Sequence, residues 1–304
     1  TARRVVAPGI DGVPSAASSP TGNEIAFVRD DSLQVVPVSG SPARLLATIP
    51  ELHSCAWSPD SRWIACAQFN NMATIPGVNF GNLAPGTIVL VPAEGGTPVE
   101  LFKRVASYAS PVWAPEGRRL YFVSNRDGPR DVYAISLGSS GKVRGLPERV
   151  TTGLGATSVS LSGDGRRLAY SVYTARANIW SVPIPSSGSV SAESATPVTT
   201  GNQVIESMRV SSDGRWLLYD SNLQGNSDIY RMPIRGRPTE QLTSDPVDEF
   251  APDLSPDGRT LVYHTWRTGT RDIEVKPLDG APTLLVTDTP MQESYPAWSP
   301  DGRS

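Results

Sequence analysis

The sequence contains few of the residues on which metal binding and catalysis most often depend. Among its 304 residues are two histidines, His53 and His264, and two cysteines, Cys55 and Cys66. The histidines lie far apart in the chain, which leaves no histidine cluster for a transition metal. Neither a Gly-x-Ser-x-Gly nucleophile elbow nor a phosphate-binding glycine loop is present. We therefore expect a domain with no metal, no cofactor and no catalytic residues.

Charge and hydropathy argue against two further kinds of partner. With 27 basic and 30 acidic residues the net charge is −3, so the chain has no basic face for nucleic acid. No apolar run approaches the roughly 20 residues that a membrane-spanning helix needs, and the N-terminus from Thr1 to Val6 has no signal-peptide pattern. Because the chain also lacks an initiator methionine, we expect a fragment of a longer protein, whose compartment the residues leave open.

One turn, in contrast, is repeated along the whole chain. The motif Ser-Pro-Asp-Gly-Arg is complete at residues 255–259 and 299–303, and altered copies begin at Ser19, Ser58, Ala114, Ser162 and Ser211. Serine can hydrogen-bond to the backbone, proline presets φ and glycine accepts the last position, as in a type I turn. Successive copies start 39 to 56 residues apart, a period typical of solenoids and propellers.

Each copy of the turn joins two short strand-like runs, and two more runs follow before the next copy. The run after the turn is apolar, as in residues 261–264, and the third begins with a polar residue before an aliphatic one, as in Asp228-Ile229. A fourth run, such as residues 240–243, closes the unit. Four strands of this length cannot bury their own faces, so neighbouring units must stack, and four-stranded sheets arranged radially form a β-propeller.

The turn motif, together with the downstream Asp228-Ile229-Tyr230, resembles the WD40-like PD40 repeats of the TolB propeller superfamily. The resemblance covers essentially the entire chain and implies an all-β fold of four-stranded antiparallel blades. It is specific for the fold and weak for function. We accordingly expect residues 1–304 to form a single β-propeller domain.

The two ends of the chain bear on the number of blades. Residues Arg3 to Ala7 align with a fourth strand, and residues Tyr295 to Arg303 align with a first strand and its turn. Six complete blades lie between them, and propellers commonly build one blade from both termini to remove open edges. The favoured prediction is six complete blades plus strands of a partial seventh. The alternative is a six-bladed TolB-like ring with overhanging terminal strands.

The residues that enter the innermost strands are the candidates for a binding site. They should line the mouth of the central channel, on the face opposite the repeated turns, and they are His53, Tyr108, Thr157, Glu206, Glu249 and Glu293. Three glutamates from consecutive blades would make one side of this mouth acidic, suited to a cation or the basic end of a peptide. The alternative interpretation is that these are solvated glutamates at loop ends.

An insertion in the second blade, residues 70–83, falls on the same face and carries the apolar Phe80. Such a loop must bury its apolar side chains somewhere, so it is either a lid or partner-binding loop, or a segment packed on itself. We include Phe80 among the candidate partner-binding residues.

Most of the remaining polar residues have structural interpretations. The aspartates of the repeated turn, and those that lead the third strands at Asp131, Asp228 and Asp272, are expected to cap backbone groups. His264 is expected to be a packed or surface histidine. Cys55 and Cys66 lie on the two strands of one predicted hairpin, where two free buried thiols are the favoured prediction and a strained cross-strand disulfide is the alternative.

The leading functional hypothesis is a monomeric, non-catalytic propeller that binds a protein, peptide or small ligand at the funnel face. The resemblance implies an envelope partner-binding protein, or the sensory or scaffold part of a bacterial kinase or winged-helix regulator, and it favours a periplasmic or extracytoplasmic location. The alternative is the substrate-gating propeller of a prolyl-oligopeptidase-type serine peptidase without its hydrolase domain. A propeller polysaccharide lyase would need a histidine-rich centre, which this sequence lacks.

Overall fold

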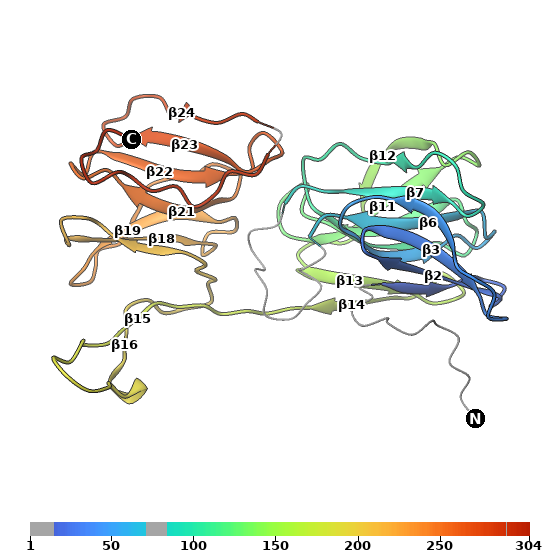
Figure 1. Cartoon of the computed structure of the whole chain (residues 1–304), viewed down its shortest axis with the longest axis horizontal. Helices are drawn as coiled ribbons and strands as arrows, with labels where there is room; N and C mark the ends of the chain where they lie inside the picture. Colours follow the sequence, from blue (N-terminus) through green and yellow to red (C-terminus); the bar gives the residue numbers. More distant parts are fainter. Residues whose placement is uncertain (1–14, 71–83, 290) are drawn as a thin grey trace. The chain divides into compact units, whose positions relative to one another are not determined.

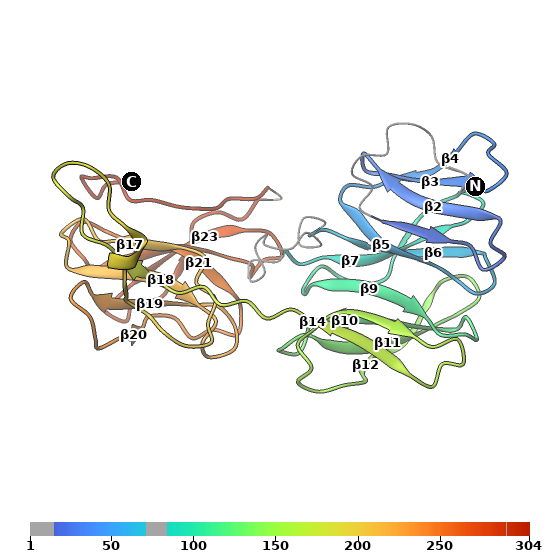
Figure 2. The same cartoon turned by 90° about the horizontal axis from the view of Figure 1, so that it is seen from below.

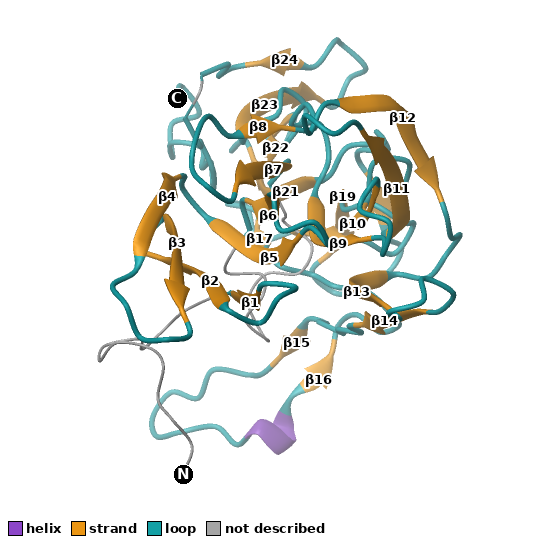
Figure 3. Cartoon of the chain, turned by 90° about the vertical axis from the view of Figure 1, so that its right-hand side faces the viewer, coloured by secondary structure: helices purple, strands orange, loops and turns teal. Residues whose placement is uncertain are grey.

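The computed structural model describes residues 15–70, 84–289 and 291–304, and this part of the chain is built from β-strands. The only helical element in it is a single 3-10 turn, Ala192–Ser194 (Figure 3). Within the same residues, no helix has the length and apolar character needed to cross a membrane. The all-β prediction is therefore confirmed.

Contacts along the chain form two compact units. The first contains the described residues from 15 to 173, and the second contains the described residues from 174 to 304 (Figure 1). Each unit has hydrophobic core clusters of its own, such as the one around Leu33 and Ile64 in the first and the one around Leu218 and Tyr263 in the second. The single-domain organisation stays a prediction.

The first unit consists of three four-stranded antiparallel sheets and one hairpin, each with its strands in chain order (Figure 2). The first blade contains β1 (Ala16–Ser18), β2 (Glu24–Arg29), β3 (Ser32–Pro37) and β4 (Arg44–Thr48). The second blade contains β5 (Leu52–Trp57), β6 (Trp63–Gln68), β7 (Thr87–Pro92) and β8 (Val99–Glu100). The third blade contains β9 (Tyr108–Trp113), β10 (Arg119–Ser124), β11 (Asp131–Leu137) and β12 (Val143–Arg149). The hairpin is β13 (Ala156–Leu161) with β14 (Leu168–Val172).

The second unit begins with a short pair of strands and continues with two four-stranded sheets, the fifth and sixth blades. The pair is β15 (Trp180–Ser181) with β16 (Thr196–Pro197). The sheets are β17 (Met208–Val210), β18 (Trp216–Ser221), β19 (Asp228–Pro233) and β20 (Glu240–Gln241); and β21 (Glu249–Leu254), β22 (Thr260–Thr265), β23 (Asp272–Pro277) and β24 (Leu284–Leu285).

Five of the six predicted four-stranded sheets thus form as expected, and the strands expected for the fourth are divided between the two units. Its strands occur as two separate two-stranded sheets, β13–β14 in the first unit and β15–β16 in the second. β15 ends before Pro183, whereas the corresponding strands β3, β7, β19 and β23 each run for six residues and end in proline.

The predicted terminal strands have different outcomes. The segment Arg3 to Ala7 lies outside the described residues. The turn at Ser299 is formed, with the Gly302 N–H bonded to the Ser299 carbonyl at 2.9 Å, but residues 295–298 pair with no strand in the described part of the chain. The number of blades and the closure of a ring stay predictions.

The repeated turn has the structural role expected of it. In the copy at Ser255, the serine hydroxyl donates to Asp257 at 2.6 Å and accepts from the Thr260 N–H at 2.9 Å, while Asp257 accepts from the Arg259 N–H at 3.0 Å. Hydrogen bonds from Ser255 and the Arg259 backbone lower the pKa of Asp257. Gly258 has φ near 75°, a conformation that favours glycine. These carboxylates therefore hold turns together, as predicted.

Tryptophans on the first strands connect neighbouring blades of the first unit. The indole N–H of Trp57 in β5 donates to the Ala17 carbonyl in β1 at 3.0 Å, and that of Trp113 in β9 donates to the Ala56 carbonyl in β5 at 3.2 Å. Both tryptophans directly precede the repeated turn. The sequence repeat thus produces a repeated bond between adjacent sheets.

The favoured prediction for the cysteines is wrong. Cys55 and Cys66 form a disulfide across β5 and β6, with their Cα atoms 4.1 Å apart. Ser54 has φ near 49°, and the register of the two strands shifts between His53 and Ala56. This bulge brings Cys55 opposite Cys66, an effect that a regular strand pattern does not reveal.

Candidate functional site: an acidic cluster in the second unit

Five carboxylates and one arginine lie near one another in the second unit, and we call this group the acidic cluster. Its acidic members come from the starts of β19 and β21, from β23 and from the loop between β20 and β21, and they are Asp228, Asp245, Asp248, Glu249 and Glu274. The arginine, Arg267, lies in the loop between β22 and β23. These loops lie at the strand ends opposite the repeated turns, on the face predicted to bind.

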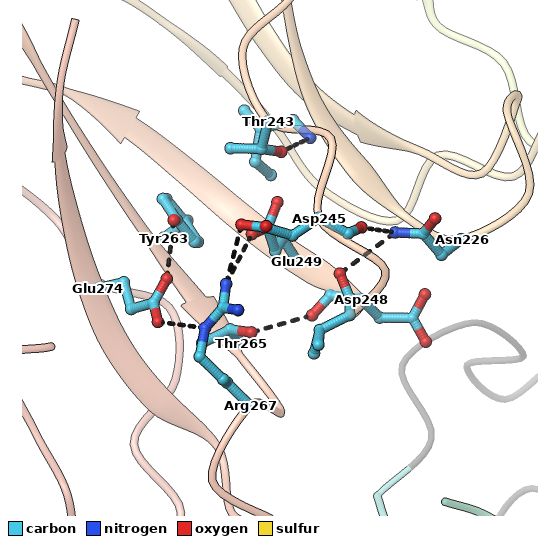
Figure 4. A network of polar contacts seen from close by, with 11 residues as sticks. Asn226, Thr243, Asp245, Asp248, Glu249, Tyr263, Thr265, Arg267 and Glu274 are labelled. Carbon is cyan, nitrogen blue, oxygen red and sulfur yellow. Dashed lines mark hydrogen bonds and ion pairs between the residues drawn. The ribbon is translucent and has the colours of Figure 1, made fainter. Parts of the chain in front are cut away.

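The guanidinium of Arg267 is shared by three carboxylates (Figure 4). Its Nε lies 2.7 Å from Glu274 Oε1, and its Nη2 lies 3.0 Å from Asp245 Oδ2 and 3.7 Å from Glu249 Oε1. The Tyr263 hydroxyl donates to the other oxygen of Glu274 at 2.8 Å. The hydrogen bond that Arg267 donates to Glu274 and the charges of Glu274 and Asp245 raise the pKa of Arg267, so it remains a cation.

The acidic loop between β20 and β21 is held in place by the preceding blade. The Asn226 side chain donates to the carbonyls of Asp245 at 2.8 Å and Val247 at 3.2 Å (Figure 4). The Ser227 N–H donates to Asp248 Oδ1 at 2.8 Å. The Thr265 hydroxyl bonds to the Asp248 carbonyl at 3.4 Å. The loop carboxylates are therefore positioned before any partner arrives.

Glu249 is the most deeply buried carboxyl group of the cluster. Its side chain is 0% exposed. Burial, together with the charges of Asp245, Asp228 and Glu274, raises the pKa of Glu249 to about 8, although a hydrogen bond with Thr243 opposes the shift. Glu249 is consequently mostly protonated at neutral pH. Three carboxylates, Asp245, Glu249 and Glu274, thus face the single guanidinium of Arg267.

Asp228 lacks the partners that its counterpart in the third blade has. Only one of its oxygens is bonded, by the Gln241 side chain at 3.0 Å, while the other has no partner within the described part of the chain. Burial raises the pKa of Asp228 to about 6, and Asp248 and Asp245 contribute. The prediction of a satisfied backbone cap therefore fails for Asp228.

Asp131, at the same position of β11, fulfils that prediction. It accepts from Arg149 at 2.5 Å and from the N–H groups of Gly153 and Leu154 at 2.9 and 3.0 Å. Although burial opposes ionisation, these bonds lower the pKa of Asp131. The difference between the two aspartates arises from their neighbours and not from their own positions.

A cavity of about 470 Å³ borders the fifth blade within the second unit. Tyr219 of β18 and Tyr230 of β19 lie on its wall, with their rings stacked at 5.8 Å. The remaining lining residues are Val198, Thr199, Thr200, Gln203, Ser221, Leu223, Met232, Arg237, Pro238 and Thr239.

The three glutamates predicted at the funnel mouth all lie in the second unit. Glu249 belongs to the acidic cluster. The Glu206 N–H donates to Asp220 Oδ1 at 2.7 Å, and the other oxygen of Asp220 accepts from the Ala251 N–H at 3.4 Å, so Asp220 links the approach to β17 with β21. Glu293 accepts from the Thr289 hydroxyl at 2.6 Å, within the last loop. Their role in binding stays a prediction.

Two of the three candidate residues of the first unit are packed in its interior, whereas Thr157 is only partly buried and its hydroxyl donates to the Ser171 carbonyl at 3.1 Å. His53 is 3% exposed, with one ring nitrogen 2.9 Å from the Ser54 hydroxyl and the other 2.7 Å from the Phe69 carbonyl. Burial lowers its pKa. Tyr108 is 4% exposed and stacks on Phe102 at 4.5 Å. The structure therefore keeps both away from solvent, and Phe80 lies outside the described residues.

Strand register explains part of this outcome. Tyr108 and Glu249 each pair with the last residue of the following strand, Ser124 and Thr265, whereas His53 is one position further along its own strand, opposite Ala67. Because successive side chains of a strand point to opposite faces, the predicted set combined two positions that do not face the same way.

The sequence analysis did not single out Arg267, Asp245, Asp248 or Glu274 as site residues. One signal was present, since Asp245, Asp248 and Glu249 fall within five residues in a connection between strands. The contribution of Arg267 could not be read from the sequence, because it depends on which loops meet.

Two further observations bear on chemistry at this site. Within residues 15–70, 84–289 and 291–304, no group of three or more His, Cys, Asp or Glu side chains could hold a metal ion.

His264 in β22 is buried between the rings of Phe250 and Tyr295, and burial, with the charge of Arg271, lowers its pKa to about 4. This is the packed histidine that the sequence suggested.

Comparison with known proteins gives distant similarities. No protein-family model matches the chain. It is 24% identical over 179 residues to an uncharacterised protein of Agrobacterium fabrum, an alignment that covers 59% of this chain and 42% of that protein, so the chain spans less than half of this relative.

Solved structures of TolB proteins are also similar to the chain. One is a provisionally assigned TolB from Agrobacterium tumefaciens, at 20% identity and a TM-score of 0.32, with 95% of this chain and 86% of that chain covered. Another is TolB from Acinetobacter baumannii, at 17% identity and a TM-score of 0.32, with 95% and 55% covered. At this level of similarity no function follows, and the functional argument rests on the site itself.

Proposed function

We propose that this chain is a non-catalytic β-propeller domain that binds a cationic segment of a protein or peptide partner through the acidic cluster. The observation that carries the proposal is the imbalance of charge around Arg267, which is the single arginine shared by Asp245, Glu249 and Glu274. Clustered charge of one sign raises the local concentration of an oppositely charged partner and speeds its association.

The arrangement differs from an ion-pair network that serves stability alone. Such a network needs near balance, because an uncompensated buried charge is strongly destabilising. Here one guanidinium faces three carboxylates, and burial drives Glu249 to its neutral form. Asp245 remains about half exposed, so a cationic partner can reach its carboxylate.

The proposal of a non-catalytic role has separate support. Both histidines are buried, the pKa of each is lowered by burial, and both ring nitrogens of His53 are in contact with polar groups of the fold. A general base needs access to substrate and a pKa near the working pH, which neither histidine offers.

The role in a longer protein follows as a finer proposal. We favour a sensory or scaffold domain of a bacterial signalling protein, and the disulfide between Cys55 and Cys66 accords with an oxidising, extracytoplasmic compartment. The full-length gene separates this from a peptidase propeller: a downstream Gly-x-Ser-x-Gly hydrolase would support the peptidase, and an adjoining kinase or winged-helix domain would support the sensor.

Binding of charged peptides tests the proposed function. Fluorescein-labelled Gly/Ser peptides that carry several lysines and arginines are expected to bind in fluorescence anisotropy, and glutamate versions are not. The affinity should fall steeply as salt rises to physiological ionic strength. The double variant Asp245→Asn with Asp248→Asn should weaken binding about tenfold, because it removes two carboxylates of the acidic cluster.

A matched double variant serves as the control. Glu94→Gln with Glu116→Gln removes two exposed carboxylates from the first unit and should leave the affinity unchanged. Equal losses in both double variants would show that overall charge, and not the acidic cluster, attracts the peptide. Equal binding of cationic and anionic peptides would refute the proposed function.

A further inference from the structure

The third blade contains a complete version of an ion pair that the fifth blade leaves incomplete. In the third blade, Arg149 of β12 lies directly across from Tyr133 of β11. Its guanidinium reaches past that tyrosine to Asp131, two residues earlier on the same strand, at 2.5 Å. Asp131 is 0% exposed, so the fourth strand of this blade neutralises a buried carboxylate.

In the fifth blade a neutral residue takes the place of this arginine. Gln241 of β20 lies directly across from Tyr230 of β19, and Asp228 is two residues before Tyr230. Gln241 therefore occupies the position in the fifth blade that Arg149 occupies in the third, but its side chain is uncharged. One oxygen of Asp228 remains without a partner among the described residues, although the residue is only 2% exposed. A buried, half-satisfied carboxylate is costly for a fold.

A cavity lies beside the neighbours of this carboxylate. The lining of the cavity in the second unit includes Tyr230, two residues after Asp228 on β19, and Ser221, the direct cross-strand partner of Asp228, but not Asp228 itself. The stacked rings of Tyr219 and Tyr230 form the adjoining surface. Arg237, the cation among the lining residues, follows the opposite end of β19.

We propose that Asp228 and this cavity receive an arginine side chain from the bound partner. The incoming guanidinium would form with Asp228 the hydrogen-bonded ion pair that Arg149 forms with Asp131 within the third blade. This inference rests on the proposed function and narrows the chemistry of the partner from any cationic segment to one with an arginine.

Arginine fits this place better than lysine for two reasons. A guanidinium is a planar fork that can bond a carboxylate oxygen and a neighbouring acceptor together, whereas an ammonium is a compact, strongly hydrated charge. A planar cation also stacks on aromatic rings, which Tyr219 and Tyr230 offer beside Asp228. The chain shows this preference elsewhere, because the guanidinium of Arg231 stacks on the Trp216 ring at 4.7 Å.

The experiment compares three peptides that differ at one position, which is arginine, lysine or the neutral isostere citrulline. Binding to the intact chain is measured by isothermal titration calorimetry. The arginine peptide is expected to bind about tenfold more tightly than the citrulline peptide and several-fold more tightly than the lysine peptide. In the variant Gln241→Arg the new guanidinium should form an ion pair with Asp228 within the chain and so compete with the peptide. Affinity for the arginine peptide should therefore fall about tenfold.

Leu45→Arg is the matched control. Leu45 of β4 lies across from Gln34, the same position in the first blade, where Ser32 replaces the aspartate, and its side chain is exposed. This variant adds the same charge and should leave binding unchanged. As a second variant, Asp228→Asn should remove the preference for arginine over citrulline while other cationic contacts persist.

The outcomes separate the inference from the function on which it rests. If the three peptides bind within about twofold of one another and binding stays salt-dependent, the arginine site is wrong and the cationic partner stands. Equal losses in Gln241→Arg and Leu45→Arg would also overturn the arginine site. If none of the cationic peptides binds the unmodified chain, the proposed function fails with it.

Discussion

At the scale of single residues, the acidic cluster makes stability depend on pH through Glu249. Its pKa of about 8 in the folded chain lies above the ordinary value of 4.5. Folding therefore favours the protonated form, and the stabilisation associated with that proton is fully present below about pH 4.5. It is lost as pH rises through about 8, because ionisation of this carboxyl group lowers the free energy of the unfolded chain before it can do so in the folded chain. Asp228, Asp245, Glu274 and Arg267 are the charged groups that face it.

The substitution Glu249→Gln should remove this dependence. We expect the variant to be more stable than the original at pH 8.5, by on the order of 3 kcal/mol, and the gain to shrink towards zero at pH 4.5. Urea unfolding followed by tryptophan fluorescence at several pH values measures the difference. The control Glu240→Gln changes an exposed member of a surface ion pair and should shift the free energy of unfolding by less than about 0.5 kcal/mol at any pH. A stability gain for Glu249→Gln that is constant with pH would contradict the protonated state.

At the scale of elements, strands with the same position in the repeat differ in which charges they satisfy. Arg149 of β12 neutralises Asp131, whereas Gln241 of β20 leaves Asp228 half satisfied. The substitution Arg149→Gln should therefore leave Asp131 of the third blade, like Asp228 of the fifth, as a buried carboxylate with no cation on the fourth strand.

We expect Arg149→Gln to destabilise the chain at pH 7 by about 1–3 kcal/mol, since a buried carboxylate loses its cation while Arg149 itself is partly exposed. The loss should be smaller in acid, where Asp131 protonates. Arg144→Gln, on the same strand, is the control, because Arg144 has no acidic partner within the described residues. A shift of the unfolding midpoint equal to that of the control would show that the pair contributes nothing.

The β5–β6 hairpin carries a prediction of its own. The disulfide between Cys55 and Cys66 closes a loop with a sequence separation of 11, so reduction should destabilise the first unit by about 2–3 kcal/mol. Thiol titration of the denatured, non-reduced chain should find no free thiol. Two titratable thiols would restore the interpretation that the sequence favoured. The variant Cys55→Ser with Cys66→Ser, unaffected by reductant, is the control for general effects of the reducing agent.

At the scale of the whole molecule, the repeat was readable from the sequence and the cluster was not. The Ser-Pro-Asp-Gly turn encodes its own hydrogen bonds within about five residues, and five of the six four-stranded sheets that its copies predicted form with the expected strand order. The strands expected for the fourth blade occur as two two-stranded sheets. The carboxylates that contact Arg267 come from elements that are distant in sequence. The strand that contains His53 has a bulge at Ser54, which a regular strand pattern does not reveal. Local patterns predict elements well, whereas charge clusters depend on how elements meet.

The tryptophan bonds of the first unit have an experimental consequence. Each indole N–H of Trp57 and Trp113 ends on a carbonyl of the preceding sheet, so its exchange with deuterium requires adjacent sheets to part while their own ladders can stay intact. Most backbone amides of the same sheets exchange only when a ladder opens. Comparing the two kinds of exchange rate in one NMR experiment would separate the free energy of docking one blade on the next from that of forming a blade.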